Sequence, residues 1–421
     1  MGGKYKMKTK EKIVLNCYKY KYKDYGWNPI FCMVMRIKHK ALKRNPNVTS
    51  FEEMIKAINI QYYNDFFSCV NITQHGNLVG LKYNLQTTPK DMWDNPNSPY
   101  RECRSIVIDI ENEKIVMCPF RKFFNLDEVE ENKLNKVRID ILKSNHFEIT
   151  NKLDGSMQCA TYYNGEILLT GSTSINSENS WRIKDGYSML DNSYKVLIKS
   201  FPNYTFIFEY ISKKDVHVVN YSKEQEGLYL IGIRHNITGI ELSYREVITL
   251  AHKYNVKVVE MEHLTLNELL KEMKIAKCDE KEGWVLNIDD GHKIKIKTDD
   301  YVNMHRLFGV RPSPNIVIES IADGDYDDFY AKVPEAQKEF VANIKEQVTN
   351  YVNKIESRID FAYDNLPKGD KKEVMIHIQT MVDKDIRKYV ISKYLGQEYN
   401  ILKSKNGRYS KASEIGIKEE I

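Results

Sequence analysis

The chain has 421 residues, enough for two or three domains that each bury a core, and 42% hydrophobic with 29% charged residues is ordinary for a soluble globular protein. The net charge of +5 is the balance of 63 basic and 58 acidic residues, so it permits a phosphate-rich partner without requiring one.

The seven cysteines are scattered along the chain, with no Cys-x-x-Cys pair. This pattern argues against a disulfide framework or a structural zinc site and for a reducing compartment. The sequence contains no run of 18 apolar residues and no signal peptide. It therefore predicts a cytoplasmic protein that does not engage a membrane.

Residues 1–25 interleave lysines with tyrosines. A solvated arm or an edge strand explains this pattern, and a nucleic-acid contact is the alternative. We assign residues 1–60 to a basic N-terminal extension that is packed on the core or flexibly attached to it.

The first segment with recognisable chemistry runs from residue 101 to residue 125. Arg104 leads into an apolar strand, and Lys122 follows the next strand and precedes two phenylalanines. Adjacent aromatic residues usually pack in a core, which would explain Phe123 and Phe124. Arg104 and Lys122 each lie at the end of a strand, where side chains can project into a cleft.

Lys152 lies on a short loop, Lys152-Leu-Asp-Gly-Ser156, between two predicted strands. The second strand continues into a hairpin, because Asn164-Gly165 is a strong two-residue turn signal. A lysine held on such a loop can reach a ligand, but as a nucleophile it must lose its proton. A surface lysine before an Asp-Gly turn fits the same motif, so the neighbouring motifs decide.

Two further motifs carry acids within apolar strands. Glu209 interrupts the aromatic strand at 204–210, where a carboxylate is costly unless it is paired or binds a ligand. Glu282 precedes the strand at 283–288, and a tight turn leads from there to Lys293-Ile-Lys295-Ile-Lys297. Three lysines on one strand face repel unless they face solvent or a polyanion, which suggests a phosphate and metal site.

The C-terminal part is helical. Apolar residues from Phe340 to Ile359 recur every three or four positions, which predicts a long amphipathic helix. Pro367 and Gly369 end it, and residues 374–395 are predicted to form a second helix. Residues 244–275 are predicted to form two helices around a short strand.

In this order the motifs resemble those of the covalent nucleotidyltransferases, and most closely those of the RNA ligase 1 family of T-even-type phages. The resemblance covers about residues 80–305. It is carried by Glu-Cys-Arg104, Lys122-Phe-Phe-Asn-Leu126, Lys152-Leu-Asp-Gly-Ser156, Phe208-Glu209-Tyr210, Glu282-Gly-Trp-Val285, Lys295-Ile-Lys297 and Asp299-Asp-Tyr301.

The resemblance implies an α+β fold. An ATP-grasp-like nucleotidyltransferase domain of antiparallel sheets flanked by helices would span residues 61–305. An all-α domain would follow over residues 306–421. The implied activity is that of an ATP-dependent RNA ligase that joins 5′-phosphate and 3′-hydroxyl ends in RNA repair, with tRNA as a substrate and a separate end-healing kinase or phosphatase as a partner.

The resemblance also implies three chemical steps. Lys152 would attack the α-phosphorus of ATP and become a lysine–AMP phosphoramidate. AMP would then pass to an RNA 5′-phosphate, and a 3′-hydroxyl would displace it. Lys295 and Lys297 would stabilise charge on the α-phosphate and help to keep Lys152 deprotonated, while Glu282 would hold Mg²⁺ or Mn²⁺ through water.

The remaining implied roles concern binding of the nucleotide and RNA. Glu209 would accept a hydrogen bond from the ribose, and the adenine would lie between Ile231 and Val285, both of which also suit a plain core. The other implied binding residues are Arg104 and Lys122 at phosphates, Phe124 beside them, Asp154, Gly155 and Tyr301.

Two positions depart from the family pattern. The basic residue often found after the lysine loop is absent from Thr170-Gly-Ser-Thr-Ser-Ile175, and Lys213, Lys214 or Lys293 could replace it. Ser105 stands where glycine is usual. Other functions stay open: a DNA ligase or capping enzyme, which would carry a string of short C-terminal strands, and a non-catalytic RNA-binding protein on a ligase scaffold.

Overall fold

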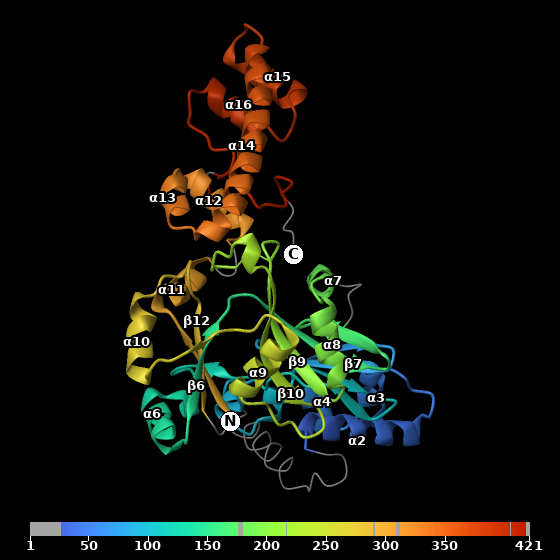
Figure 1. Cartoon of the computed structure of the whole chain (residues 1–421). Coiled ribbons are helices and arrows are strands. Elements are labelled where there is room, and N and C mark those ends of the chain that lie inside the picture. Colours follow the sequence, from blue (N-terminus) through green and yellow to red (C-terminus); the bar gives the residue numbers. More distant parts are fainter. Residues whose placement is uncertain are drawn as a thin grey trace, which may run out of the picture. The chain divides into compact units, whose positions relative to one another are not determined.

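The computed structural model describes residues 27–175, 180–215, 217–288, 291–308, 312–404 and 406–417, and the chain forms two compact units (Figure 1). The first unit comprises residues up to 215 together with 221–277 and 281–299. The second comprises residues 216–220, 278–280 and those from 300 onward. The lysine- and tyrosine-rich residues 1–25 lie outside the described part, and their predicted role stays a prediction.

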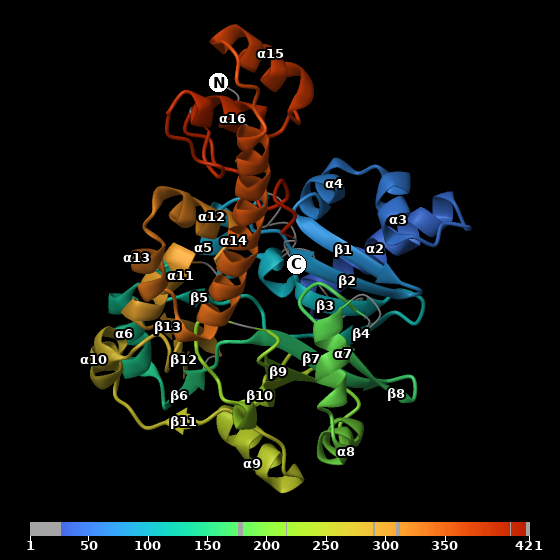
Figure 2. The same cartoon turned by 90° about the horizontal axis from the view of Figure 1, so that it is seen from above.

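Three β-sheets form the framework of the first unit (Figure 2). Their strand orders are β1-β2-β3-β4, β10-β9-β7-β8 and β11-β6-β12-β13-β5. Neighbouring strands are antiparallel except for the short pair β5 and β13. The strands are β1 (Val70–His75), β2 (Leu78–Tyr83), β3 (Arg104–Asp109), β4 (Lys114–Met117), β5 (Phe124–Asn125), β6 (Phe147–Lys152), β7 (Ser156–Tyr163), β8 (Glu166–Thr170), β9 (Tyr204–Ile211), β10 (Gly227–His235), β11 (Met261–Glu262), β12 (Gly283–Ile288) and β13 (His292–Lys297).

Helices flank these sheets, so the predicted α+β class is confirmed. They are α2 (Pro29–Arg44), α3 (Phe51–Ile58), α4 (Gln61–Phe67), α5 (Asp91–Asp94), α6 (Leu134–Lys143), α7 (Trp181–Ser188), α8 (Asn192–Ser200), α9 (Tyr244–Tyr254) and α10 (Leu266–Ile275). The predicted arrangement of two helices around a short strand is present as α9, β11 and α10. Both helices begin with a capping box, Ser243 with Glu246 and Thr265 with Glu268.

Helix α2 belongs to the core of the first unit. Its Asn28 side chain accepts hydrogen bonds from the first-turn amides, and Pro29 occupies the first helical position, so the local sequence favours a helix start here. Ile30, Val34 and Ile37 follow at helical spacing and are fully buried, in the same hydrophobic cluster as strands β2 and β3. The described part of the predicted extension is thus integral to this core.

The second unit is helical. Its helices are α11 (Asp299–Phe308), α12 (Pro314–Asp323), α13 (Tyr326–Ala331), α14 (Glu335–Asp364), α15 (Lys371–Met381) and α16 (Arg387–Tyr394). The 30-residue α14 is the predicted amphipathic helix, and its buried Ile344, Val348, Ile355 and Ile359 supply two successive hydrophobic clusters.

The prediction of one helix over residues 374–395 is wrong, because α15 and α16 are separate. Val382 is extended, with φ −90° and ψ 137°, and its carbonyl accepts hydrogen bonds from the Arg387 guanidinium. Arg358 of α14 binds Asp383 and Asp385, at 2.8 and 2.7 Å, in the intervening turn. These long-range contacts override a continuous helical pattern.

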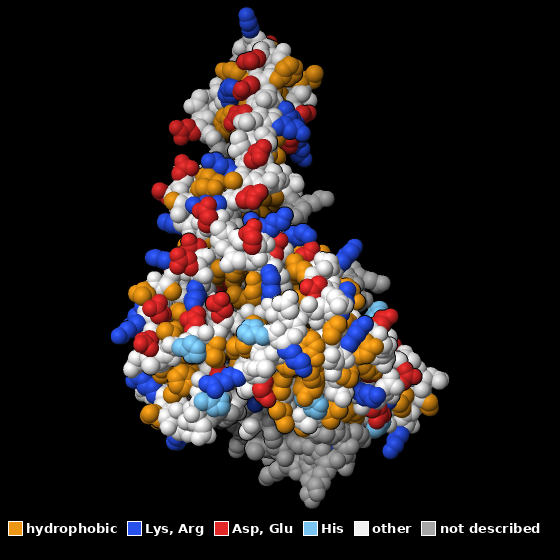
Figure 3. All heavy atoms as spheres, in the orientation of Figure 1, with side chains coloured by type: hydrophobic (Ala, Val, Ile, Leu, Met, Phe, Trp, Pro, Cys, Tyr) orange, Lys and Arg blue, Asp and Glu red, His pale blue; other side chains and the backbone are white. Residues whose placement is uncertain are grey.

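Basic and acidic side chains are interspersed over the face shown in Figure 3, as the near-balance of 63 and 58 charges suggests. None of the helices in the described ranges is both long enough and apolar enough to cross a bilayer.

Candidate active site

Strands β6, β12 and β13 lie side by side in the third sheet, with β12 in the centre. Their register sets Gly283 opposite both Lys152 and Lys297, and two residues further along it sets Val285 opposite Lys295. Because side chains alternate between the faces of a strand, these residues project from one face. The alternating lysines therefore share a face, as predicted, and that face also carries Lys152.

Glu282 holds two of these lysines together. Its side chain is only 3% exposed, with Oε2 2.5 Å from Lys152 Nζ and Oε1 2.9 Å from Lys297 Nζ. Burial would raise the pKa of this carboxyl, but the two ammonium groups outweigh burial and lower it. Gly283 permits this placement, since it has φ +150° and a Cβ there would lie 2.2 Å from the Ile296 carbonyl oxygen.

The protonation state of Lys152 differs from the prediction. Burial lowers the pKa of its amine, but the carboxylates of Glu282 and Glu209 outweigh burial and raise the pKa above the usual lysine value. The expectation that Lys295 and Lys297 keep Lys152 deprotonated is therefore wrong for the ligand-free protein. Lys297 is itself neutralised by Glu282, so its charge does little to expel the proton from Lys152.

Lys295 has the opposite electrostatic environment. Burial, and then the charges of Arg104 and Lys152, lower the pKa of its amine well below the usual value. The Phe123 ring contacts two cationic groups, because Lys295 Nζ and the Arg104 guanidinium carbon are each 5.0 Å from its centroid. Arg104 Nη1 is buried and has no hydrogen-bond partner among the described residues.

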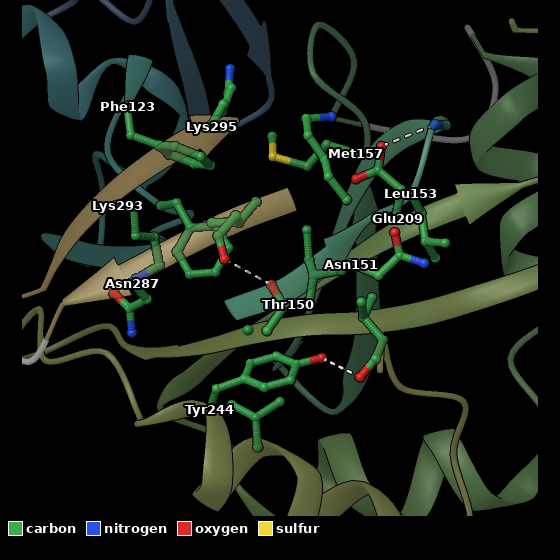
Figure 4. A pocket seen from close by; sticks show the side chains of 18 of the residues that line it. Phe123, Thr150, Asn151, Leu153, Met157, Glu209, Tyr244, Asn287, Lys293 and Lys295 are labelled. Atoms are coloured by element: carbon green, nitrogen blue, oxygen red, sulfur yellow. Dashed lines mark hydrogen bonds between the residues drawn. The ribbon is translucent and has the colours of Figure 1, made fainter. Parts of the chain in front are cut away.

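A cavity of about 260 Å³ opens over this face of the sheet (Figure 4). Arg104, Lys152, Glu209 and Lys295 give it a charged part, where Figure 4 shows Lys295 beside Phe123. The apolar part is lined by Ile231, Leu242, Tyr244, Val247, Val259 and Val285. A cavity with one cationic region and one apolar region suits a ligand that carries phosphates and a planar base.

Ile231 reaches the cavity because strand β10 is irregular there. Leu230 pairs with Phe208 and Gly232 with Ile207, so Ile231 is an extra residue in a β-bulge. Bulges redirect a side chain relative to the regular pleat. Ile231 and Val285, the predicted adenine contacts, both line the cavity.

The loop after Lys152 is held by main-chain hydrogen bonds. The Gly155 N–H donates to Glu209 Oε1 at 3.2 Å, and the Asp154 N–H donates to the Tyr221 hydroxyl at 2.8 Å. A Cβ at Gly155 would lie 2.4 Å from the Tyr210 carbonyl oxygen, so only glycine allows this approach. Ser156 donates to Asp215 at 2.5 Å.

Sequence reasoning missed Tyr221 and Asp215. Both lie between β9 and β10 in a segment without periodic hydrophobicity, so no pattern connected them with the lysine loop. It also favoured Phe124 over Phe123. Phe124 is only 2% exposed and does not line the cavity, whereas Phe123 does.

Lys122 lies beside the cavity rather than in it. Its ammonium is 4.7 Å from the Tyr83 ring centroid, 5.4 Å from that of Trp93 and 4.8 Å from that of Phe124. It lines a neighbouring pocket of about 310 Å³. Tyr301 belongs to the second unit, where it is buried and stacks on His305 at 5.9 Å.

The carboxylates fit an ion that a substrate brings with it. Among the residues that the structure describes, no three His, Cys, Asp or Glu side chains are arranged to hold a metal. Mg²⁺ commonly binds through one or two carboxylates together with water and substrate phosphates. Glu209, which lines the cavity, offers such an oxygen ligand, whereas both oxygens of Glu282 are paired with lysines in the ligand-free protein.

Comparisons with known proteins find similar sequences over the part of the chain that carries this site. Residues 102–301 match the family model described as RNA ligase. The chain is 25% identical over 287 residues to a protein of Autographa californica nuclear polyhedrosis virus named as a bifunctional polynucleotide kinase/RNA ligase, covering 63% of this chain and 38% of that protein. It is 30% identical over 258 residues to a protein of Thermovibrio ammonificans named as an RNA ligase, covering 58% of this chain and 62% of that protein.

The chain thus spans less than two thirds of each of these relatives. Among solved structures, a Naegleria gruberi RNA ligase variant with ATP and Mn is 18% identical, with a TM-score of 0.32 over 40% of this chain and 55% of that chain. The same ligase with PPi is also 18% identical, with a TM-score of 0.31 over 41% and 55%. These likenesses are too distant to assign any property to this chain.

Proposed function

We propose that this chain, whose residues 102–301 match the RNA ligase family model, is an ATP-dependent RNA ligase that joins a 5′-phosphate to a 3′-hydroxyl through lysine–AMP and AMP–RNA intermediates. The observation that carries the proposal is the buried Lys152 amine, 2.5 Å from Glu282, at a cavity that combines cations with an apolar chamber. The nucleophile, the phosphate-binding charges and the base-binding surface meet there.

In the first step the Lys152 amine attacks the α-phosphorus of ATP and pyrophosphate leaves. Arg104 and Lys295 have no carboxylate within ion-pair distance among the described residues, and they stabilise the charge that develops on the phosphate oxygens. Glu282 accepts a hydrogen bond from the Lys152 ammonium, which must release one proton to solvent before its nitrogen can bond to phosphorus. The Glu209 carboxylate accepts a hydrogen bond from the ribose.

A magnesium or manganese ion would be held by Glu282 and Glu209, through water and the nucleotide phosphates. When bound, it would neutralise charge on the departing pyrophosphate. In the later steps AMP passes to an RNA 5′-phosphate, and the 3′-hydroxyl then forms the new phosphodiester as AMP leaves. Arg104 and Lys122 would contact phosphates in these steps.

The test is incubation with α-labelled ATP and Mg²⁺, followed by denaturing electrophoresis. We expect one labelled species in the parental protein, lost in Lys152→Ala and equally in Lys152→Arg, which keeps the charge that pairs with Glu282 but is not a nucleophile. Labelling of either variant at the parental level, or no labelling of the parental protein beside an active control ligase, would contradict the proposal.

A second experiment concerns the later steps. Arg104→Ala should slow AMP transfer to RNA more than it slows labelling, and an equal loss in both would refute this role. The helical residues after 300 favour an RNA ligase over a DNA ligase or capping enzyme, because those two would carry additional short strands there. A non-catalytic RNA-binding protein would bind RNA without becoming labelled.

We also propose that tRNA is among the substrates and that a separate kinase or phosphatase prepares the ends. Truncation near residue 307 tests whether the helical unit selects tRNA. If the truncated protein discriminates tRNA from a generic oligonucleotide as before, the helical unit does not confer the preference.

A further inference from the structure

We propose that Lys82 is a phosphate-binding residue of this site, acting with Arg104 and the Ser172 hydroxyl. The inference rests on the proposed ligase function and assigns a new residue to it. It also identifies the source of the positive charge that the segment 170–175 lacks.

A β-bulge brings the three residues together. Leu81 pairs with Ile106 and Lys82 with Arg104, so Ser105 is the extra residue on β3, and it has φ +65°. This left-handed conformation is the one that a glycine usually supplies at such a bulge. The bulge leaves Lys82 directly across from Arg104.

The segment 170–175 is fastened to this bulge. Ser105 Oγ donates to the Ser172 carbonyl at 2.7 Å, and Lys82 Nζ donates to Ser172 Oγ at 3.2 Å. Lys82, Ser105 and Ser172 line a recess of about 220 Å³ together with further hydroxyl residues of the segment. Arg104, across from Lys82, lines the catalytic cavity itself.

This arrangement is unfavourable without a ligand. Like charges opposite each other on antiparallel strands repel. Burial lowers the pKa of Lys82, and Arg104 lowers it further although Tyr83 opposes the change. No carboxylate lies within ion-pair distance of either cation in the described ranges, whereas Lys152 and Lys297 share Glu282.

The donors match a phosphate group. A guanidinium, an ammonium and a hydroxyl can each donate to a separate phosphate oxygen. Two of the three other lysines that could replace the missing basic residue are already neutralised, since Lys214 pairs with Asp185 at 2.5 Å and Lys293 pairs with Glu241. The phosphate can come from ATP or from the RNA end, and separate assays distinguish these sources.

The test compares Lys82→Ala with Lys114→Ala, an exposed lysine on β4 of the same sheet. Two rates are measured separately. The first is that of lysine–AMP formation, and the second is that of AMP transfer from preformed lysine–AMP to a 5′-phosphorylated oligonucleotide. We expect Lys82→Ala to slow at least one step tenfold or more and Lys114→Ala to change neither. Loss in the first step identifies a nucleotide phosphate, and loss in the second identifies the RNA phosphate.

Moving the charge provides a sharper variant. Adding Ser172→Lys to Lys82→Ala should restore at least a third of the lost rate, because the new ammonium can reach the same place. The thermal midpoint of Lys82→Ala should equal or exceed the parental value, since the repulsion with Arg104 is gone. The inference would be overturned if Lys82→Ala kept the parental rates in both steps. It would also be overturned if the thermal midpoint of Lys82→Ala were lower while its rates per folded molecule were normal.

A binding experiment tests this inference separately from the ligase proposal. Titration calorimetry with inorganic pyrophosphate and with a 5′-phosphorylated oligonucleotide should show binding at least fivefold weaker in Lys82→Ala for one of the two. If the parental protein binds them and forms no lysine–AMP, the ligase proposal fails while the role of Lys82 stands. Equal affinities of the parental and Lys82→Ala proteins would refute that role.

Discussion

Glu282→Gln should make Lys152 a better general nucleophile and a worse ligase nucleophile. The parental carboxylate lies 2.5 Å from the Lys152 amine and raises its pKa, against the effect of burial. Glutamine keeps the size of the side chain and removes the charge. Burial and nearby cations then favour the neutral amine, and among the carboxylates Glu209 and Asp154 are left to oppose them.

The magnitude follows from the geometry. Two unit charges about 4 Å apart attract by about 4 kcal/mol at an effective dielectric constant of about 20. The glutamine oxygen can still accept a hydrogen bond from Lys152 in the variant, so we take about half of this energy, ~2 kcal/mol. The fraction of neutral amine at pH 8 should then rise by roughly 30-fold.

The assay is the rate at which a small amine-reactive reagent modifies Lys152 at pH 8, read by peptide mass spectrometry. We expect an increase of roughly tenfold or more in Glu282→Gln, while lysine–AMP formation falls by a similar factor or more. Glu262→Gln, at a carboxylate that pairs with Lys281 outside the cavity, serves as the control. Unchanged or slower modification of Lys152 would refute the claim that Glu282 keeps this amine protonated.

Three further predictions follow from local geometry and charge. Lys295→Met should abolish labelling but raise the thermal midpoint at pH 7. Because burial lowers the pKa of Lys295 in the folded state, the unfolded parental chain binds more protons than the folded one. The gain in thermal midpoint should therefore shrink as the pH rises toward the usual lysine pKa, and a gain that does not change with pH would contradict this account. Gly155→Ala should lower the free energy of unfolding by about 1–3 kcal/mol, because its Cβ would lie 2.4 Å from a main-chain oxygen. Gly171→Ala should be tolerated, because its Cβ would meet nothing nearer than 3.5 Å. Chemical denaturation measures both variants, and equal stabilities would exclude the clash. Ser105→Ala should lower the free energy of unfolding by about 1 kcal/mol, because the hydrogen bond of the hydroxyl is lost. Ser105→Gly should stay near the parental stability, because glycine relieves the φ +65° conformation and so offsets the same loss. A glycine variant less stable than the alanine variant would refute the strain.

The strands that carry the site could be predicted from the sequence because their signals are local. Alternating isoleucine and lysine over 293–297 indicated one charged face, and the Asn164-Gly165 turn indicated a hairpin. Both features are present, with φ +50° and +87° at the two turn residues. The placement of Lys152 beside Glu282, 130 residues further along the chain, depends on the register of strands β6 and β12. The order of the motifs does not determine this register.

The parts that sequence reasoning missed depend on long-range contacts. Phe123 and Phe124 are indistinguishable as adjacent aromatic residues, and only the fold brings the first into contact with Arg104 and Lys295 and buries the second. Lys82 belongs to a strand with no motif of its own. Its proximity to Ser172 follows from a bulge at Ser105, a position where the sequence showed only an unusual residue.

The cationic residues of the site are of two kinds. Some are paired with a carboxylate that holds the nucleophile, and the others are unpaired and available to bind phosphates. Lys152 and Lys297 share a buried carboxylate, so their charges are satisfied in the ligand-free protein. Arg104, Lys295 and Lys82 have no such partner among the described residues, and the pKa values of both lysines are lowered. Partly buried cations without a partner destabilise a fold unless an anion binds to them. Arg104 and Lys295 line the same cavity as Lys152, and Lys82 lies across from Arg104, so an anion can be bound at these cations while Glu282 still holds the nucleophile.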